Sequence, residues 1–84
     1  MEDLPNIVAR NVLRLRQETG LSQEKLADRS KIDRSYYGRI ERGDANITVK
    51  TVGKVAIGLR VHPSVLFELP ENHPYRDLIE DANS

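Results

Sequence analysis

Residue types that typically begin or end helices occur at short intervals along this chain. Ser22, Asp33 and Thr48 carry side chains that favour helix N-caps, because their oxygens accept hydrogen bonds from the first free backbone N–H groups. Gly20 and Gly43 suit the left-handed residue that follows a helix. The spacing allows only short helices, and no stretch shows the alternation of a strand. The sequence therefore predicts an all-α fold.

These signals predict a compact bundle of five helices. Pro5 and Pro63 suit the first turns of the first and last helices, because proline needs no N–H partner there. The expected helices cover residues 5–19, 23–30, 34–42, 49–59 and 63–67. A short C-terminal helix is also possible over residues 75–81. The fourth helix has an apolar stripe at helical spacing, expected to face the core: Val49, Val52, Val55, Ala56 and Leu59.

The length and composition exclude several classes of protein. A chain of 84 residues supports one small core and leaves little room for a substrate cavity. It has no cysteine, so it forms neither a disulfide scaffold nor a thiolate zinc site, and a reducing cytoplasm suits it. No apolar run is long enough for a membrane helix, and the acidic first residues do not resemble a targeting signal. We expect a cytoplasmic protein with no membrane partner.

Charge is unevenly distributed although the net charge is zero. Residues 4–62 hold twelve basic and six acidic side chains, whereas residues 63–84 hold five acids and one arginine. We expect one folded domain over residues 1–68, followed by an acidic tail over residues 69–84. A basic surface bears on binding rather than on the fold.

The segments 23–30 and 34–42 are separated by a three-residue turn, which is the spacing of a helix-turn-helix. The second segment would bury Tyr37 and Ile40. Its opposite face would present Arg34, Ser35, Tyr36 and Arg39. Arginine pairs with the guanine edge through two hydrogen bonds, and a short serine approaches bases without filling the groove. This face is therefore a candidate DNA-reading surface, although basic residues also occur on ordinary solvated helix faces.

The run Leu-Ser-Gln-x-x-Leu-Ala at residues 21–27 and the ending Arg-Ile-Glu-Arg-Gly at residues 39–43 occur in register. This pattern resembles the phage-repressor-like, Xre-type family of bacterial and phage transcription regulators over residues 6–68. The resemblance implies the phage-repressor-like DNA-binding fold, double-stranded DNA as the partner, and no catalytic residue, cofactor or metal.

The resemblance also implies roles for individual residues. Base reading falls to Arg34, Ser35 and Arg39. Contacts with the DNA backbone fall to Gln23, Tyr36, Arg42 and Asn46. Three of these have simpler alternatives: Gln23 as a surface residue, Tyr36 as a cover for the core edge, and Asn46 as a turn residue.

Arg16 and Glu41 match a family pair that forms a partly buried salt bridge between the first and third helices. This pair would be structural and would not contact DNA. Two positions depart from the usual pattern. Lys31 occupies a turn position where many relatives have glycine, and Gly38 lies inside the third helix, where glycine weakens helix formation. Gly38 is either a place of close approach to the DNA backbone or a tolerated substitution.

The sequence from Asp33 onward most resembles the controller proteins of restriction–modification systems. The segments that carry this resemblance are Asp33–Tyr36, Ile40–Gly43, Asn46–Thr51, Gly58–Val61 and Leu66–Phe67. That resemblance implies an autoregulatory homodimer on a palindromic operator, acting as activator or repressor, and activation would add RNA polymerase as a partner. The expected dimer interface comprises Val61, Val65, Leu66 and Phe67, which could instead close the core of one protomer. The alternative class is a DNA-binding antitoxin or other mobile-element repressor whose tail binds a protein.

An enzyme is disfavoured by the sequence. His62 and His73 have no carboxylate at the spacing of a metal ligand, and no glycine-rich phosphate loop occurs. The acidic residues of the tail do not form a positioned acid/base pair. Nothing in the chain therefore indicates a catalytic site.

Overall fold

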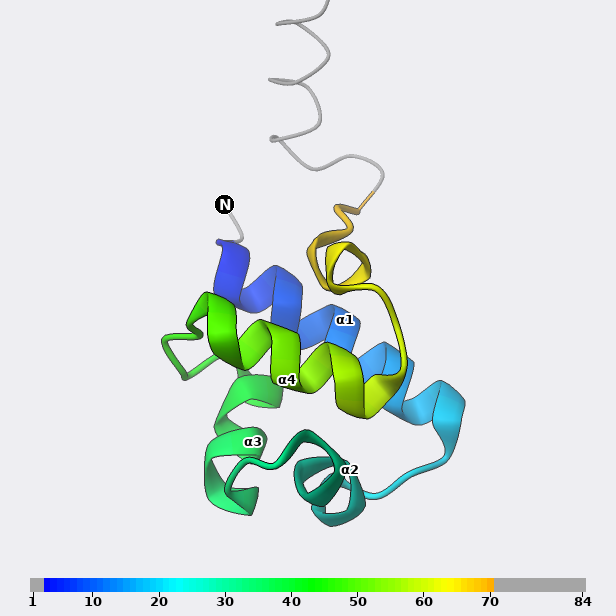
Figure 1. Cartoon of the computed structure of the whole chain (residues 1–84). Coiled ribbons are helices and arrows are strands. Elements are labelled where there is room, and N and C mark those ends of the chain that lie inside the picture. Colours follow the sequence, from blue (N-terminus) through cyan, green and yellow to red (C-terminus); the bar gives the residue numbers. More distant parts are fainter. Residues whose placement is uncertain (1–2, 71–84) are drawn as a thin grey trace, which may run out of the picture.

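The computed structural model describes residues 3–70, and these form four α-helices and one short 3-10 helix (Figure 1). No strand occurs among the described residues. The elements are α1 (Leu4–Thr19), α2 (Gln23–Ser30), α3 (Arg34–Arg42), α4 (Val49–Leu59) and η1 (Pro63–Phe67). The all-α prediction is confirmed, and the bounds of α2, α3 and α4 are those expected.

The predicted N-caps all accept a backbone hydrogen bond. The hydroxyls of Ser22 and Thr48 accept from the residue three positions on, and the Asp33 carboxylate accepts from two N–H groups. The first helix begins one residue earlier than expected. Its N-cap is Asp3, whose carboxylate accepts from Asn6 N at 3.1 Å, and Pro5 lies within the first turn.

The predicted count of five α-helices is not confirmed, because the described residues form four α-helices and the fifth expected segment is a 3-10 helix. The segment Pro63–Phe67 closes through i to i+3 hydrogen bonds, from Val65 N to His62 O at 3.0 Å and from Glu68 N to Val65 O at 3.3 Å. Five residues are too few for a stable α-helix, and the tighter turn brings Leu66 into the core, where it is fully buried. The predicted C-terminal helix at 75–81 and most of the proposed tail lie outside the described residues.

The helices pack around one core, in which α1 contacts α3, η1 and α4, and α2 contacts α3 and α4. Its largest fully buried side chains are Tyr37, Ile7, Leu26, Ile40, Leu66, Val12 and Val55. Val49 is a correction to the expected stripe, since its side chain is 90% exposed. It is the first residue of α4, so the stripe faces inward only from Val52 onward.

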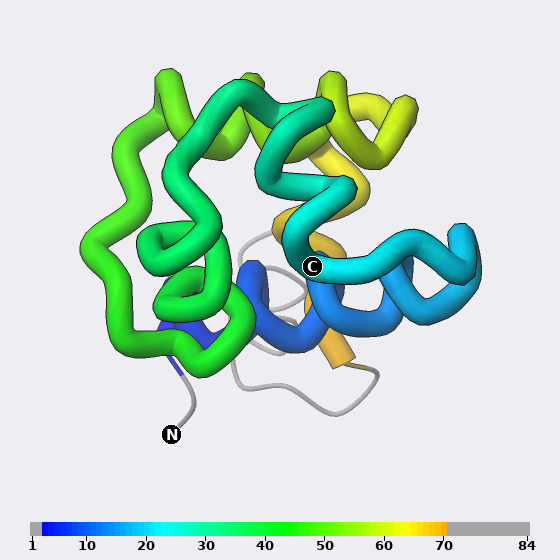
Figure 2. Tube along the Cα trace, turned by 90° about the horizontal axis from the view of Figure 1, so that it is seen from below, coloured from blue at the N-terminus to red at the C-terminus, as the bar shows by residue number. Residues whose placement is uncertain are grey.

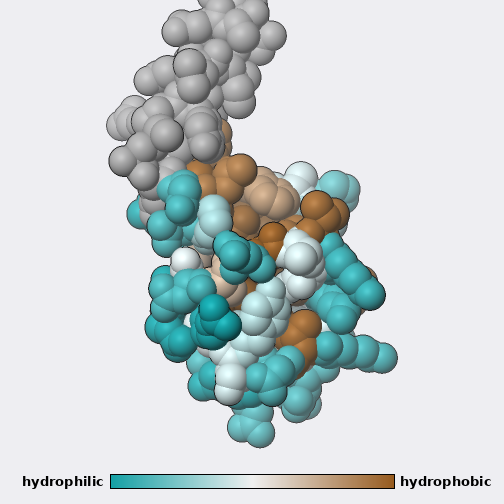
Figure 3. Space-filling view, turned by 90° about the vertical axis from the view of Figure 1, so that its left-hand side faces the viewer, coloured by the Kyte–Doolittle hydropathy of each residue, from teal (hydrophilic) through white to brown (hydrophobic). Residues whose placement is uncertain are grey.

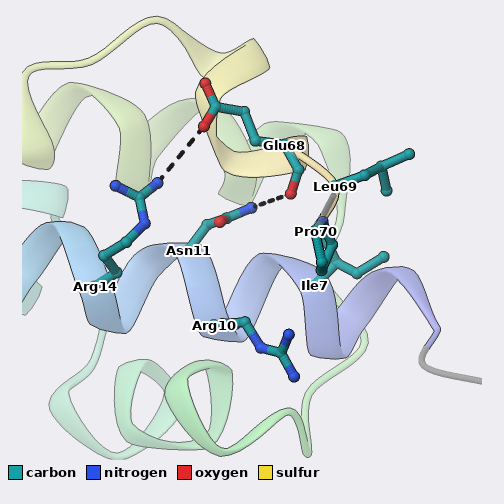
Figure 4. A pocket seen from close by; sticks show the side chains of 7 residues that line it. All are labelled: Ile7, Arg10, Asn11, Arg14, Glu68, Leu69 and Pro70. Carbon is teal, nitrogen blue, oxygen red and sulfur yellow. Dashed lines mark hydrogen bonds and ion pairs between the residues drawn. The ribbon is translucent and has the colours of Figure 1, made fainter. Parts of the chain in front are cut away.

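η1 is fastened to α1 by a buried amide. Asn11 Nδ2 donates to Leu66 O at 2.8 Å and to Glu68 O at 3.0 Å, and Arg14 lies 3.7 Å from the Glu68 carboxylate (Figure 4). These bonds satisfy carbonyl groups that a five-residue helix leaves without partners. The hydrophobic pattern does not predict this polar anchor.

Within residues 3–70, no helix combines the length and the apolar character that crossing a membrane requires.

Candidate nucleic-acid interface

α2 and α3 lie together at one end of the molecule, which Figure 2 shows from below. α2 ends at Lys31, whose backbone is left-handed with φ of 57°, and Ile32 N bonds back to Ala27 O at 3.1 Å. Asp33 then caps α3. Its carboxylate accepts from Ser35 N at 2.9 Å and from Tyr36 N at 3.2 Å. The turn is thus fixed by local hydrogen bonds, and it sets the direction of α3.

The inner face of α3 belongs to the core. Tyr37 and Ile40 are fully buried, which confirms their predicted placement. Burial raises the pKa of the Tyr37 hydroxyl well above its ordinary value, and the negative charge of Glu41 adds to that shift. Tyr37 therefore contributes packing and remains neutral at physiological pH.

The predicted ion pair between Arg16 and Glu41 is present. Arg16 Nε lies 2.6 Å from Glu41 Oε2, and Arg16 Nη2 donates to Glu41 Oε1 at 3.1 Å. The Glu41 side chain is only 4% exposed and the Arg16 side chain 17%. Two parallel bonds between a guanidinium and a carboxylate fix geometry as well as energy, so this pair joins α1 firmly to α3.

Gln23 extends this pair to α2. Its amide Nε2 donates to Glu41 Oε1 at 2.8 Å, so the first residue of α2 is tied to α3. Burial pushes the pKa of the Glu41 carboxyl upward, but the hydrogen bonds from Arg16 and Gln23 outweigh it and hold the pKa below its ordinary value. Glu41 is consequently ionised at neutral pH and holds three helices in one arrangement.

The outer face of α3 is exposed and basic. Arg34, Ser35, Arg39 and Arg42 all lie on the surface, at or beyond the first turn of the helix. The structure thus brings the three predicted base-reading residues onto one helix. Asp33 is committed to the N-cap and Glu41 to the ion pair, so the free surface of α3 carries only positive charge.

The loop after α3 engages two of these arginines. Arg39 Nη2 donates to Asp44 O at 3.1 Å, and Arg42 Nε lies 3.4 Å from the Asp44 carboxylate. Asp44 was not among the predicted site residues, although its position two residues after Arg42 was a possible signal. These exposed contacts orient the side chains only weakly in solution.

Tyr36 and Asn46, both predicted to contact the DNA backbone, meet in the structure. The Tyr36 hydroxyl donates to Asn46 O at 3.3 Å, and Tyr36 also packs against the edge of the core. Tyr36 thus links α3 to the loop that precedes α4. Asn46 itself remains exposed.

The predicted dimer residues lie in the segment from the end of α4 to the end of η1 and divide into two kinds. Leu66 is fully buried, and Val61 and Val65 pack against the core, so these three close the protomer. Phe67 is 41% exposed and lines an apolar groove with Leu4 and Val49. Apolar surface gathers in the upper part of the face in Figure 3, above a mostly hydrophilic region.

Within residues 3–70, no three histidine, cysteine or acidic side chains come together as metal ligands. α2, the turn and α3 form a helix-turn-helix that exposes a basic helix, which is the class of a DNA-binding protein.

The family profile described as helix-turn-helix matches residues 12–66. The chain belongs to this family of DNA-binding transcription regulators. The control protein C.MunI of Mycoplasma sp is 37% identical over 68 residues, which cover 80% of this chain and 92% of that protein. The regulator SutR of Escherichia coli (strain K12) is 33% identical over 72 residues, which cover 86% of this chain but only 40% of SutR.

Solved structures show the same similarity. The restriction–modification controller protein C.AhdI from Aeromonas hydrophila is 40% identical, with a TM-score of 0.73 over 75% of this chain and 96% of that one. The controller protein C.Esp1396I is 30% identical, with a TM-score of 0.72 over the whole of both chains.

Proposed function

We propose that this protein is the autoregulatory controller of a restriction–modification system and binds a palindromic DNA operator as a homodimer. The observation that carries the proposal is the exposed basic face of α3, held in place by the buried Arg16, Glu41 and Gln23 cluster. Support for the controller subtype comes from the similarity to C.MunI and C.Esp1396I along almost their entire lengths.

Two groups of residues have distinct roles in this proposal. Arg34, Ser35 and Arg39 read base edges in the major groove from the first turns of α3. The remaining predicted contacts hold the phosphate backbone and set the register: Gln23, Tyr36, Arg42 and Asn46. The rigid link between Glu41 and Gln23 supports this division, because it fixes α2 relative to α3 before DNA arrives.

The dimer is proposed to form through the apolar groove around Phe67, Leu4 and Val49 rather than through Leu66. Exposed large apolar side chains gain free energy when a second copy covers them. A two-fold dimer would place its half-sites about 34–36 Å apart along the DNA. Residues 1–68 form the DNA-binding unit in this proposal, and residues 69–84 form an acidic tail.

Regulation by such a protein depends on concentration, because the dimer forms and fills its operator by mass action. We place the protein in the bacterial cytoplasm, with RNA polymerase as a further partner if the bound dimer activates transcription. Its role is binding rather than catalysis.

Selection from random duplexes tests the proposal directly. The expected product is a palindrome with half-sites about one helical turn apart, found again in DNA beside the gene. Sedimentation should show a dimer at tens of micromolar. Recovery of no preferred sequence would contradict the function, and a monomer that binds a single half-site would contradict the homodimer.

A further inference from the structure

Gly38 lies in the middle of α3, one turn from Arg34 and one turn from Arg42. It is itself covered, because side chains from both neighbouring turns lie over it. A Cβ atom at this position would lie 3.0 Å from Arg34 Nη1 and 3.5 Å from Arg42 Nη1. Two cationic groups thus converge above Gly38, which has no side chain.

Gln23 completes this arrangement from α2. Its Oε1 lies 3.9 Å from the same Cβ position, while its Nε2 is held by the Glu41 carboxylate. The bond to Glu41 uses the amide nitrogen and leaves the amide oxygen, which is a hydrogen-bond acceptor, near the same position as the two guanidinium groups. The buried ion pair and the exposed basic face are connected through this one amide.

The charge of this cluster is unbalanced. Within residues 3–70, no carboxylate pairs with Arg34, and the Asp44 carboxylate reaches Arg42 only at 3.4 Å on the exposed side. Two guanidinium groups that share one space repel each other unless an anion lies between them. Guanidinium groups match phosphate in geometry, and each offers several N–H donors.

We propose that Gly38 is a positioning residue that forms the floor of a phosphate site, in which Arg34 and Arg42, aligned by Gln23, hold one phosphodiester of the DNA. This inference rests on the proposed DNA-binding function and deepens it. Arg34 then has two positions during binding. Over Gly38 it contacts phosphate on any sequence, and extended from the first turn of α3 it reaches a base edge at the operator.

The substitution Gly38→Ala separates this role from a structural one. Alanine favours a helix interior over glycine, so the melting temperature should rise, by about 4–8 °C. The added methyl group displaces Arg34 from the floor of the site, which is possible because the contacting atom is the end of a flexible side chain. A variant that is more stable but binds DNA less tightly is not explained by damage to the fold.

Gly53→Ala is the matched control. Gly53 lies inside α4, and a Cβ there would meet nothing within 4 Å. It should raise the melting temperature similarly and leave DNA binding unchanged. Affinity is measured on a random-sequence duplex and on an in-vitro-selected duplex across a salt series. Loss of one phosphate contact should lower the salt slope by about 0.9 and the affinity at 0.1 M salt by about eight-fold on both duplexes.

A double-mutant cycle with Arg42→Ala adds a second criterion. If Gly38 acts through the arginine pair, then Gly38→Ala should weaken binding less than two-fold in the Arg42→Ala background. If the double variant loses affinity by the product of the two single-variant losses, the phosphate site is overturned. A Gly38→Ala variant with the affinity and salt slope of the wild type would overturn it too. Those results would leave the proposed function standing, because only a wild-type protein that binds neither duplex refutes DNA binding itself.

Discussion

The two ends of this molecule differ in what fixes them and in what they expose. At the α2–α3 end, a doubly hydrogen-bonded ion pair and local caps set the geometry, and the exposed charges of α3 are cationic. At the α1–η1 end, the Asn11 amide and the exposed Arg14–Glu68 contact fasten a 3-10 turn, and exposed apolar side chains line a groove. A rigid polar end suits DNA, whose charged grooves require preset donors, whereas an apolar end suits a second protein surface.

The largest expected effect comes from the link that fixes the DNA-facing end. Glu41→Ala leaves Arg16 without its partner in a mostly buried position and should lower the free energy of unfolding by about 3–5 kcal/mol. Urea denaturation measures this loss. Glu18→Ala is the control, because the Glu18 pair with Arg14 is exposed and should contribute little. Equal stability of both variants would show that the buried pair does not hold this end.

Acid should weaken the same end. Because the pKa of Glu41 in the folded protein lies below its ordinary value of 4.5, ionisation of Glu41 stabilises the fold above pH 4.5. That contribution to stability is lost as the pH falls from 4.5 down through the lowered pKa of Glu41 in the folded protein. Denaturation between pH 7 and pH 3 should show a steeper loss in the wild type than in Glu41→Gln, which carries no proton-dependent charge at this position. Identical slopes would contradict this assignment.

The α2–α3 end was well predicted from the sequence because its determinants are local. Asp33, Ser22 and Thr48 act within three residues of their own positions, so the ends of the helices follow from short patterns. Arg16 and Glu41 are distant in the chain, and their pairing was inferred from family resemblance rather than from spacing. The geometry of their contact, and the third member Gln23, became evident only in the folded structure.

The α1–η1 end was less predictable because long-range packing decides it. Val49 continues the apolar stripe of α4 in sequence, yet it is exposed because it lies at the start of the helix, outside the core. Leu66 and Phe67 are neighbours of similar hydrophobicity, and only the tight turn of η1 determines that the first is buried and the second exposed. The side of a 3-10 turn that faces inward is not encoded in its composition.

Three arginines on α3 allow the proposed DNA contacts to be divided. Arg34→Ala and Arg39→Ala should each cost about 1–3 kcal/mol on a selected operator and relax base preference. Arg42→Ala should weaken all duplexes alike and reduce the salt slope. Competition binding with operator variants at several salt concentrations measures both effects. Equal losses on selected and random DNA for all three variants would remove the distinction between base-reading and backbone residues.

At the apolar end, Phe67→Ala should weaken dimerisation by about ten-fold or more, because the exposed ring is the largest side chain in the groove. Its melting behaviour at low protein concentration should change little. Sedimentation equilibrium measures the dimer, with Ile57→Ala as the control. Ile57 is 74% exposed but does not line this groove. If both substitutions weaken the dimer equally, the groove is not its interface.

The smallest expected effect concerns the turn of the helix-turn-helix. Within residues 3–70, each of the four α-helices is followed by a left-handed residue. Two of these are the glycines Gly20 and Gly43, whereas Lys31 and Arg60 adopt φ of 57° and 61°. A side chain in this region is strained, and glycine removes the strain but gains more freedom in the unfolded chain. Lys31→Gly should therefore stabilise the protein by only about 0.5 kcal/mol, measured by thermal melting. Gly43→Ala should do the reverse and by more, because its Cβ would also collide with Asn6. A destabilised Lys31→Gly protein would mean that the lysine side chain contributes contacts that outweigh its backbone strain.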